Sequence, residues 1–288
     1  AAKFTGDERS AAVASQAVLT LLAATRIDPS DSACRVPNGG PGVAAVLALA
    51  IYELPGADDR LLGEAERLCN FLRKSPESGG AGEGTGLALS AVVTSHKVRP
   101  DAWKADYAAK GFAAGRAAFQ TAPTPLLAAA LIPAFADFHL HTRNPEAATA
   151  VFELADWLCG TQYPAAFARN PAWAGGFRGV VSGQPADTEP TCDTAACLAA
   201  LGWAYMVTAR NADVARADRY RQAAQDAAQF VTALQYTELN TRHFENTFRV
   251  NVLIGGFHLT PSDGDLRVDA TGRCVSGLVR YLASGAER

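Results

Sequence analysis

Hydrophobic and polar positions along the chain alternate between two kinds of helical segment. The first kind carries apolar residues every three or four positions and charges on the opposite face, as in residues 8–26 and 216–231. This spacing is typical of an amphipathic helix with one face toward solvent. The second kind is small or apolar nearly all round, which predicts a buried helix.

Segments of the second kind follow glycine-rich turns. They are predicted over residues 43–52, 86–94, 191–207 and 271–282. A further pair of helices is predicted over residues 101–119 and 124–142. Strand signals are poor, and the best of them, at residues 250–257, predicts at most a short hairpin.

An internal repeat underlies this alternation. Residues 155–163 (ADWLCGTQY) resemble residues 228–236 (AQFVTALQY), and Gly-Gly-Phe follows each of them, at 175–177 and 255–257. A weaker copy starts at Ala65. Two more double glycines stand at 79–80 and 39–40. The unit is therefore a polar-faced helix, a glycine-rich turn and a small-residue helix.

Such units, packed side by side, predict an all-α fold with outer helices around inner ones. We expect an α/α toroid, or barrel, of about five to six helix pairs. No stretch has the composition of a linker, so residues 1–288 are predicted to form a single domain.

Composition limits the partners of the chain. Of its 288 residues 49% are hydrophobic and 19% charged, and the net charge is −3, which suits a large buried core. No basic stripe indicates a nucleic-acid partner. The longest apolar run, residues 123–135, is shorter than a membrane span, so no membrane span is expected.

The six cysteines include no Cys-x-x-Cys pair, and most stand in helical patterns beside apolar residues. We interpret them as buried free thiols, which favours a reducing compartment such as the cytoplasm. The sequence begins at Ala1 without a methionine, which fits either a processed chain or an engineered start. An exported mature chain, from which a signal peptide has been removed, stays an alternative.

The repeat resembles that of squalene cyclases and of protein prenyltransferase β subunits. Residues 157–162 and 230–235 match the repeat's aromatic, aliphatic and Gln positions. The segment 175–179 (GGFRG) is similar to the Gly-Gly-Phe-x-Gly of the β subunits, and 274–278 (CVSGL) is similar to a late Cys-Leu-Ser-Gly-Leu run. The resemblance implies the α/α-toroid fold of this terpenoid cyclase superfamily, of which the chain would be a divergent member.

The catalytic motifs of both relatives are incomplete here. Squalene cyclases protonate their substrate with the central acid of Asp-x-Asp-Asp-Thr-Ala, and the matching stretch, residues 190–195, reads PTCDTA. Cys192 stands at the proton donor's position, and a thiol is too weak an acid to protonate an alkene. The resemblance therefore disfavours cyclase activity.

Protein prenyltransferases bind zinc through Asp-x-Cys and a distant His. Here Pro190 and Ala270 stand at the positions of the acid and the histidine. One cysteine does not make a zinc site, so no metal and no cofactor is expected. His139 and His141, two apart on a predicted helix, point in different directions and do not share a metal in the i, i+4 manner.

Carboxylates near the start of the 191–207 helix are the candidate catalytic groups. Inner-helix starts ring the end of the toroid where ligands bind in this fold. The candidates are Asp193, Asp187, Glu189 and Asp269. The structural alternative for Asp193 and Asp269 is a helix-start acid that interacts with the exposed amides. For the others it is a solvated loop position.

Aromatic and basic side chains of the same loops are candidate ligand contacts. They are Arg178, Phe177, Trp173, Trp203, Tyr205, Arg267 and His258. Core packing is the alternative for the aromatic residues, since Trp203 and Tyr205 stand in a helix predicted to be buried.

Three hypotheses about function remain open, and whether the chain is an enzyme is one of the open points. The first is a protein that binds or converts an apolar, isoprenoid-like small molecule. The second is a non-catalytic scaffold or partner-binding module whose protein partner is unknown. The third is a carbohydrate-active lyase or hydrolase, since α/α toroids also carry those activities.

Overall fold

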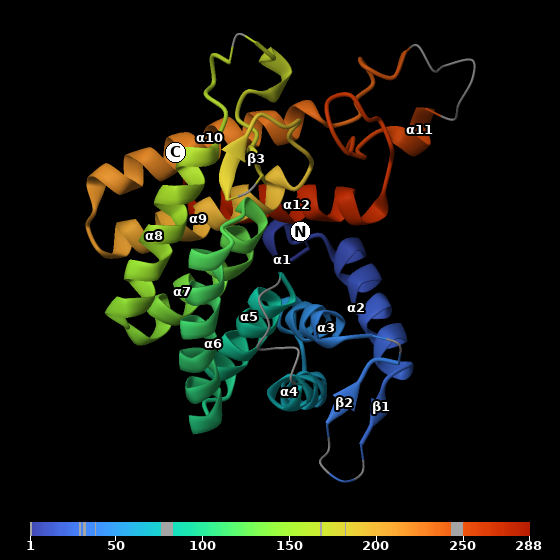
Figure 1. Ribbon diagram of the computed structural model, residues 1–288. Coiled ribbons are helices and arrows are strands. Elements are labelled where there is room, and N and C mark those ends of the chain that lie inside the picture. The colour runs from blue at the N-terminus through green and yellow to red at the C-terminus, as the bar shows by residue number, and fades with distance from the viewer. Residues whose placement is uncertain are drawn as a thin grey trace. The chain divides into compact units, whose positions relative to one another are not determined.

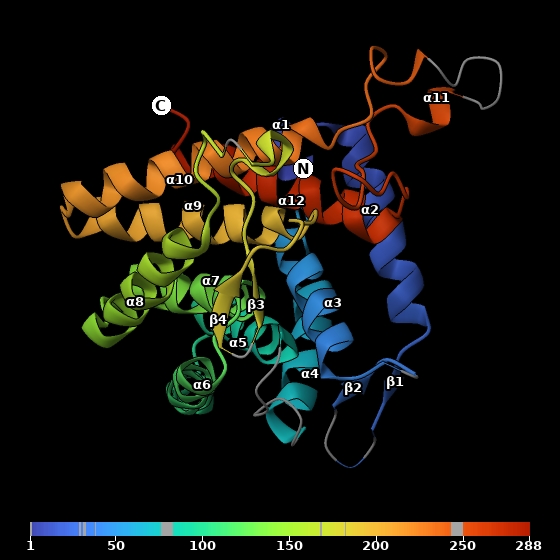
Figure 2. The same cartoon turned by 45° about the horizontal axis from the view of Figure 1, so that its top comes forward.

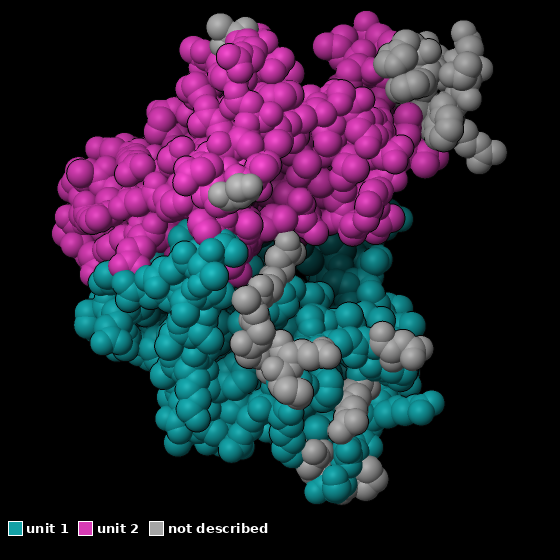
Figure 3. Space-filling view, viewed as in Figure 1, with its two compact units in different colours: residues 1–122, 130–150 teal, residues 123–129, 151–288 magenta. Residues whose placement is uncertain are grey.

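The computed structural model describes residues 2–28, 30, 33–37, 39–75, 83–167, 169–181, 183–242 and 250–288. Two compact units divide the chain (Figure 3). Unit 1 comprises residues 1–122 and 130–150, and unit 2 comprises residues 123–129 and 151–288. Each unit is built from α-helices with one short hairpin (Figure 1). The expected single domain stays a prediction.

Unit 1 contains most of the first three helix pairs. Its elements are α1 (Ala2–Thr5), α2 (Glu8–Ala23), β1 (Arg26–Ile27), β2 (Cys34–Arg35), α3 (Pro41–Glu53), α4 (Asp59–Lys74), α5 (Glu83–Val98) and α6 (Ala102–Thr121). Two helices contribute to both units, α7 (Pro125–Thr142) and α8 (Pro145–Thr161). Inner helix α3 packs on α4 and α5, and α5 packs on α6.

Unit 2 contains the last two helix pairs and the longest loops. Its elements are the 3₁₀ turn η2 (Pro171–Trp173), β3 (Gly179–Val181), β4 (Gln184–Ala186), α9 (Thr194–Arg210), α10 (Val214–Ala233), α11 (Val250–Leu253) and α12 (Val268–Ser284). Helices α9 and α10 run side by side (Figure 2). Helix α9 packs against α10 and α12.

Acidic or amide side chains start the outer helices. Each accepts a hydrogen bond from a first-turn backbone amide, which would otherwise lack a partner. The caps of α2, α4, α6, α8 and α10 are Asp7, Asp58, Asp101, Asn144 and Asp213. Inner helices α3 and α9 have no side-chain cap of this kind.

Burial separates the outer from the inner helices largely as the periodicity predicts. Outer helix α10 buries Tyr220, Ala224, Ala227 and Val231, a stripe with helical spacing, and exposes its charged face. Inner helix α9 is buried on most of its surface.

Helix α12 departs from this expectation. It buries one face, including Ala270, Cys274 and Gly277, but Val268 and Leu282 are exposed. The prediction of burial all round is therefore wrong for this helix. Within the described part of unit 2, α12 packs mainly on α9, and this contact covers only one face.

The strand prediction at residues 250–257 is also wrong. Residues Val250–Leu253 form the single helical turn α11, and Phe257 makes only an isolated bridge with Gln235. The unit 2 hairpin lies instead at β3–β4, where Gly183 supplies the positive φ of the tight turn. The double glycine at 79–80 lies outside the described residues.

The six cysteines are free, as predicted, and five of them are buried. Burial raises the pKa of Cys69 and of Cys159 to about 12 each. These two thiols therefore behave as apolar side chains of the core.

A buried ion pair connects two outer helices of unit 1. Glu66 on α4 accepts hydrogen bonds from Lys104 Nζ on α6 (2.6 Å), from Tyr52 Oη (2.9 Å) and from Ser95 Oγ (2.6 Å). The Lys104 side chain is only 2% exposed. Its ammonium also donates to the Arg99 carbonyl oxygen at 2.7 Å, so the buried charge is well compensated.

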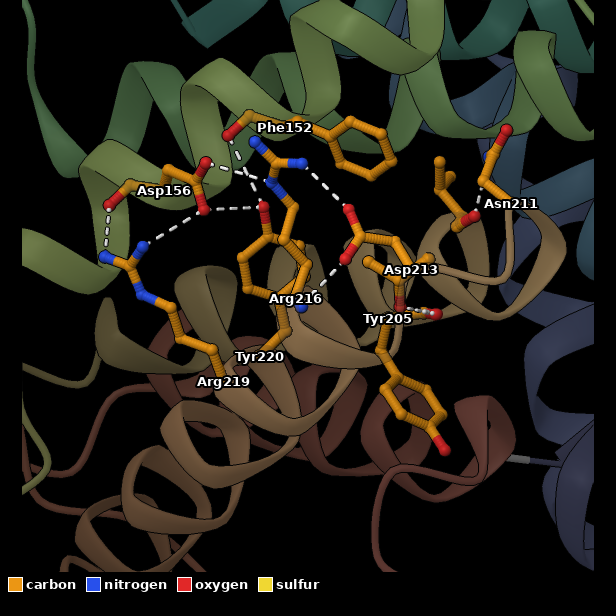
Figure 4. A network of polar contacts seen from close by, with 10 residues as sticks. Phe152, Asp156, Tyr205, Asn211, Asp213, Arg216, Arg219 and Tyr220 are labelled. Carbon is orange, nitrogen blue, oxygen red and sulfur yellow. Dashed lines mark hydrogen bonds and ion pairs between the residues drawn. The ribbon is translucent and has the colours of Figure 1, made fainter.

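An equivalent network connects two outer helices of unit 2 (Figure 4). The Asp156 carboxylate on α8 accepts from Arg216 Nε (3.1 Å), Arg219 Nη1 (3.2 Å) and Tyr220 Oη (2.9 Å), all on α10. Arg216 also donates to Asp213 Oδ2 at 2.8 Å, and its guanidinium lies over the Phe152 ring. Burial raises the pKa of Tyr220, whose hydroxyl therefore stays a donor.

The two networks occupy the same place in the repeat. Glu66 and Asp156 both follow the alanine that begins the repeated sequence. Lys104 and Arg216 both stand three residues after the aspartate that caps the next outer helix. In the last copy, on α10, the acid is replaced by Gln229.

A methyl group at Gly277 is expected to destabilise unit 2. A Cβ there would lie 2.3 Å from the Ala195 carbonyl oxygen of α9, so Gly277→Ala should lower the free energy of unfolding by about 1–3 kcal/mol. Gly272→Ala, in the same helix with open space around it, should raise it by about 0.5–1 kcal/mol. Chemical denaturation measures both, and equal effects would contradict the close packing of α9 and α12.

Removal of one partner from the unit 1 pair is expected to be costly. Lys104→Met should lower the free energy of unfolding by about 3 kcal/mol, because Glu66 then keeps a charge without its cation. The double variant Glu66→Gln/Lys104→Met should lose less than the sum of the single variants. Arg219→Met, which removes a half-exposed partner of Asp156, should cost about 1 kcal/mol or less. Additive losses in the double variant would show that Glu66 and Lys104 act independently.

Candidate functional site

The glycine-rich turns of the last two repeats have the same hydrogen bonds. The Tyr163 amide donates to the Gly176 oxygen (2.8 Å) and its oxygen accepts from Gly175 (3.1 Å). Tyr236 makes the same pair with Gly256 (2.8 Å) and Gly255 (2.9 Å). The Gln-Tyr and Gly-Gly-Phe signatures are thus the two sides of one closed turn.

Positive φ angles explain the first glycine of each pair. Gly175 has φ +81° and Gly255 has φ +89°, values that side chains strongly disfavour. At Gly175 a Cβ would also lie 2.1 Å from the Asp226 oxygen of α10. Gln162 anchors this turn, because its side-chain amide donates to Gly175 O and Ala223 O, both at 2.9 Å.

Two arginines donate hydrogen bonds to Asp187, the first candidate acid of this loop. Asp187 accepts from Arg169 Nη1 at 2.9 Å and from Arg178 Nε at 3.3 Å. The Arg178 guanidinium carbon also lies 4.8 Å from the centre of the Tyr163 ring. The structure thus brings Asp187 and Arg178 together, as expected, and adds Arg169.

Three aromatic side chains gather beside this ion-pair group. The Tyr163 ring contacts Phe167 (4.8 Å between centroids) and Trp173 (5.5 Å). The Phe167 and Trp173 rings are nearly parallel, with 16° between their planes, and both are partly exposed. Phe177, by contrast, is buried, so its predicted ligand contact gives way to the packing alternative.

Glu189 joins the loops of the two repeats. Its carboxylate accepts from the Ser262 amide (2.9 Å) and from the Ser262 hydroxyl (2.6 Å). Both contacts cross from the loop before α9 to the loop before α12. Glu189 is therefore a connector between loops, and its predicted catalytic role stays a prediction.

Asp193 precedes α9 but does not cap it through its side chain. Its carboxylate forms a short ion pair with Arg273 of α12. The Asp193 amide instead donates to Thr191 Oγ1 at 3.1 Å, so Thr191 satisfies this donor. Asp193 thus stands at the helix start, as the structural alternative predicts, but its carboxylate pairs with Arg273 and accepts no hydrogen bond from the first-turn amides.

Asp269 lies in the exposed first turn of α12 and pairs with Arg267 through two hydrogen bonds, of 3.0 and 2.8 Å. The hydrogen bonds from Arg267 hold the pKa of Asp269 below its usual value. Arg267 is engaged here with an acid of its own helix.

His258 stacks on Tyr236, with 4.0 Å between ring centroids. The Tyr236 hydroxyl donates to the Gly264 oxygen through a short hydrogen bond. Burial lowers the pKa of His258, and the nearby Asp263 opposes this effect. The stack therefore holds a neutral imidazole above pH 6.5, the usual pKa of histidine.

The two aromatic candidates on α9, Trp203 and Tyr205, belong to the helix itself and not to the loop before it. Trp203 is partly buried under Arg280 of α12, whose guanidinium carbon is 4.4 Å from its ring centroid. Tyr205 is partly exposed. The ligand-binding roles of Trp203 and Tyr205 stay predictions.

Arg169, Phe167 and Ser262 belong to this site, although sequence reasoning did not single them out. Arg169 and Phe167 precede the Gly-Gly-Phe turn without a repeated counterpart, so the repeat carried no signal for them. Arg169 reaches Asp187, 18 residues further along the chain, because the closed turn folds the chain back on itself.

Among the residues that the structure describes, no three His, Cys, Asp or Glu side chains lie close enough together to hold a metal ion. None of the described helices has the length and apolar character needed to cross a bilayer.

Comparison with known proteins confirms the fold class. No family model matches the chain, and no curated protein matches it in sequence. The crystal structure of a sugar epimerase from a ruminal bacterium is similar, with a TM-score of 0.63, 10% identity and coverage of 86% of this chain and 71% of that chain. The all-α fold of α/α-toroid type, predicted from the repeats, is thus confirmed. The similarity is compatible with the predicted superfamily resemblance and does not establish it.

The His258–Tyr236 stack predicts a pH effect with a defined sign. As the pH decreases below 6.5, His258 takes up a proton more readily in the unfolded chain than in the folded loop. The free energy of unfolding should therefore decrease as the pH decreases. Above that value this contribution to stability is fully present. His258→Phe, which keeps an aromatic ring on Tyr236, should remove part of the acid dependence between pH 6.5 and 5.

Urea titrations at several pH values measure this effect. The control is His141→Phe, at an exposed position near the end of α7, which should leave the acid dependence unchanged. An unaltered acid dependence in His258→Phe would show that this histidine does not govern the loop.

Proposed function

We propose that the loop face of unit 2, formed by the loops before α9 and α12, binds a carbohydrate, and that it prefers an acidic sugar. The observation that carries this proposal is the Arg169–Asp187–Arg178 group beside the Phe167 and Trp173 rings. Ligand sites for small polar molecules combine such aromatic surfaces with a few oriented polar groups.

The charges of this group favour an anionic ligand. Two guanidinium groups share one carboxylate, which leaves one net positive charge. The Arg169 side chain is 74% exposed, so its remaining donors can bind a ligand carboxylate. Arginine presents its donors in a planar fork that matches the two oxygens of a carboxylate.

The aromatic rings suit the apolar face of a sugar. Trp173 and Phe167 are partly exposed next to the charged group. The structurally similar protein is described as a sugar epimerase, which agrees with this ligand class by analogy of fold.

Binding is proposed in preference to catalysis because the candidate acids already have partners. Asp187 accepts from two arginines, Glu189 from Ser262, Asp193 from Arg273 and Asp269 from Arg267. A general acid must present a transferable proton to the substrate. The carbohydrate lyase or hydrolase activity stays a prediction, as do the apolar isoprenoid-like ligand and the non-catalytic scaffold.

A ligand panel tests the proposal. It contains oligogalacturonate, oligoglucuronate, neutral cello- and manno-oligosaccharides, and farnesyl and geranylgeranyl diphosphate. We expect the acidic oligosaccharides to raise Tm and to bind by calorimetry, with an affinity that falls as salt rises. Equal binding of neutral sugars would contradict the charge preference. Binding of the polyprenyl diphosphates alone, or of nothing, would contradict the carbohydrate proposal.

Variants locate the site. Arg169→Ala should weaken binding of the acidic sugar about tenfold, equal to about 1.4 kcal/mol. Trp173→Phe should retain more affinity than Trp173→Ala, because it keeps a ring. Arg210→Ala, in the last turn of α9 at the opposite end from Asp193, should bind like the unaltered protein. Equal losses in Arg169→Ala and Arg210→Ala would place the ligand elsewhere.

A further inference from the structure

Two buried thiols of unit 2 meet where α9 begins. Cys192 directly precedes Asp193 and α9, and Cys274 lies in α12. They are 2% and 0% exposed. The Cys274 thiol donates a hydrogen bond to the Cys192 carbonyl oxygen, with 3.9 Å between Sγ and O, and the two thiols are close enough for each to shift the pKa of the other.

Three contacts fix the chain around Cys192 relative to α12 and the loop before it. The Cys192 amide donates to the Leu259 oxygen at 2.8 Å. The residues next to the thiols, Asp193 and Arg273, form an ion pair. One turn further along α12, Gly277 lies against the Ala195 backbone, where α9 and α12 approach closely.

The pair is chemically asymmetric. The neighbouring Cys274 thiol lowers the pKa of Cys192, whereas the Cys192 side chain and burial raise the pKa of Cys274. Burial raises the pKa of each of the other four thiols, those of Cys34, Cys69, Cys159 and Cys197. Since the thiolate is the reactive form, Cys192 is the favoured site of attack on an oxidant.

We propose that Cys192 and Cys274 are a modification site, at which a peroxide oxidises the two thiols to a disulfide between α9 and α12. The Cys192 thiolate attacks hydrogen peroxide, the O–O bond breaks, and a sulfenic acid and hydroxide result. The Cys274 sulfur then attacks the sulfenic sulfur, the S–S bond forms and the S–O bond breaks. The released hydroxide and the hydroxide of the first step take up the two thiol protons, so one peroxide becomes two waters.

The cross-link would stabilise the loop face of unit 2 covalently. The segment before α9 carries Glu189 and Asp193, which already contact the loop before α12 and α12 itself. A disulfide at the same junction adds a bond that closes a long stretch of chain. Oxidised protein should therefore unfold at a higher temperature than reduced protein.

Mass spectrometry of the full-length protein tests the proposal. Folded, reduced protein is treated with hydrogen peroxide, the remaining thiols are alkylated, and proteolytic peptides are mapped with and without dithiothreitol. We expect a reducible peptide pair that contains Cys192 and Cys274, the loss of two alkylation sites, and a Tm several degrees higher. The other four cysteines should remain alkylatable after unfolding.

Matched variants serve as controls. Cys274→Ala should abolish the cross-linked peptides. Because this variant also removes the group that lowers the pKa of Cys192, Cys192 should react with peroxide more slowly, and its sulfenic acid should be trapped by dimedone. Cys197→Ala, one turn further along α9, should still form the cross-link. Circular dichroism of each variant confirms that it is folded.

Several outcomes would overturn the proposal. They are a different cysteine pair in the reducible peptide, a cross-link that forms only in denaturant, and sulfinic acid at Cys192 without any cross-link in the folded protein. No reaction of Cys192 within hours in millimolar peroxide would also overturn it. None of these results depends on the carbohydrate ligand.

Discussion

The closed turn between Gln-Tyr and Gly-Gly-Phe is the constraint on which the rest of unit 2 depends. At Tyr163 and at Tyr236, main-chain hydrogen bonds on both sides pull the chain back onto the end of an outer helix. The glycine with positive φ makes this return possible, and Gln162 ties the turn to α10. The loops that carry Arg178, Asp187 and His258 all start from these turns, so their positions follow from one backbone arrangement used twice.

Charged pairs then connect neighbouring outer helices. Glu66 reaches Lys104 in unit 1, and Asp156 reaches Arg216 in unit 2, each through an acid at the same repeat position. In each pair the basic partner, Lys104 or Arg216, lies in the first turn of its helix, three residues after the cap. The ion pair therefore connects the start of this helix to the preceding outer helix. The inner helices α9 and α12 combine the ion pair of Asp193 and Arg273 with close packing of Gly277 against Ala195.

The four candidate acids are engaged in a similar way. Asp187, Asp193 and Asp269 accept hydrogen bonds from arginines, and Glu189 accepts from the amide and hydroxyl of Ser262. The remaining donors of Arg169 lie beside the partly exposed rings of Phe167 and Trp173. That arrangement suits recognition of a polar ligand, while the buried pair of Cys192 and Cys274 offers a separate, redox chemistry at the same junction.

The sequence by itself determined the helix pairs, the repeat and the all-α fold, because hydrophobic periodicity and glycine turns are local properties of the chain. It also located Asp187, Arg178 and His258 in loops that the fold brings to the same turns. It did not determine the partners of these side chains. Arg273 with Asp193, Ser262 with Glu189 and Cys274 with Cys192 are 80, 73 and 82 residues apart. Only the packing of α12 on α9 decided those contacts, because a long-range contact depends on where two helices meet in space and not on the pattern within either.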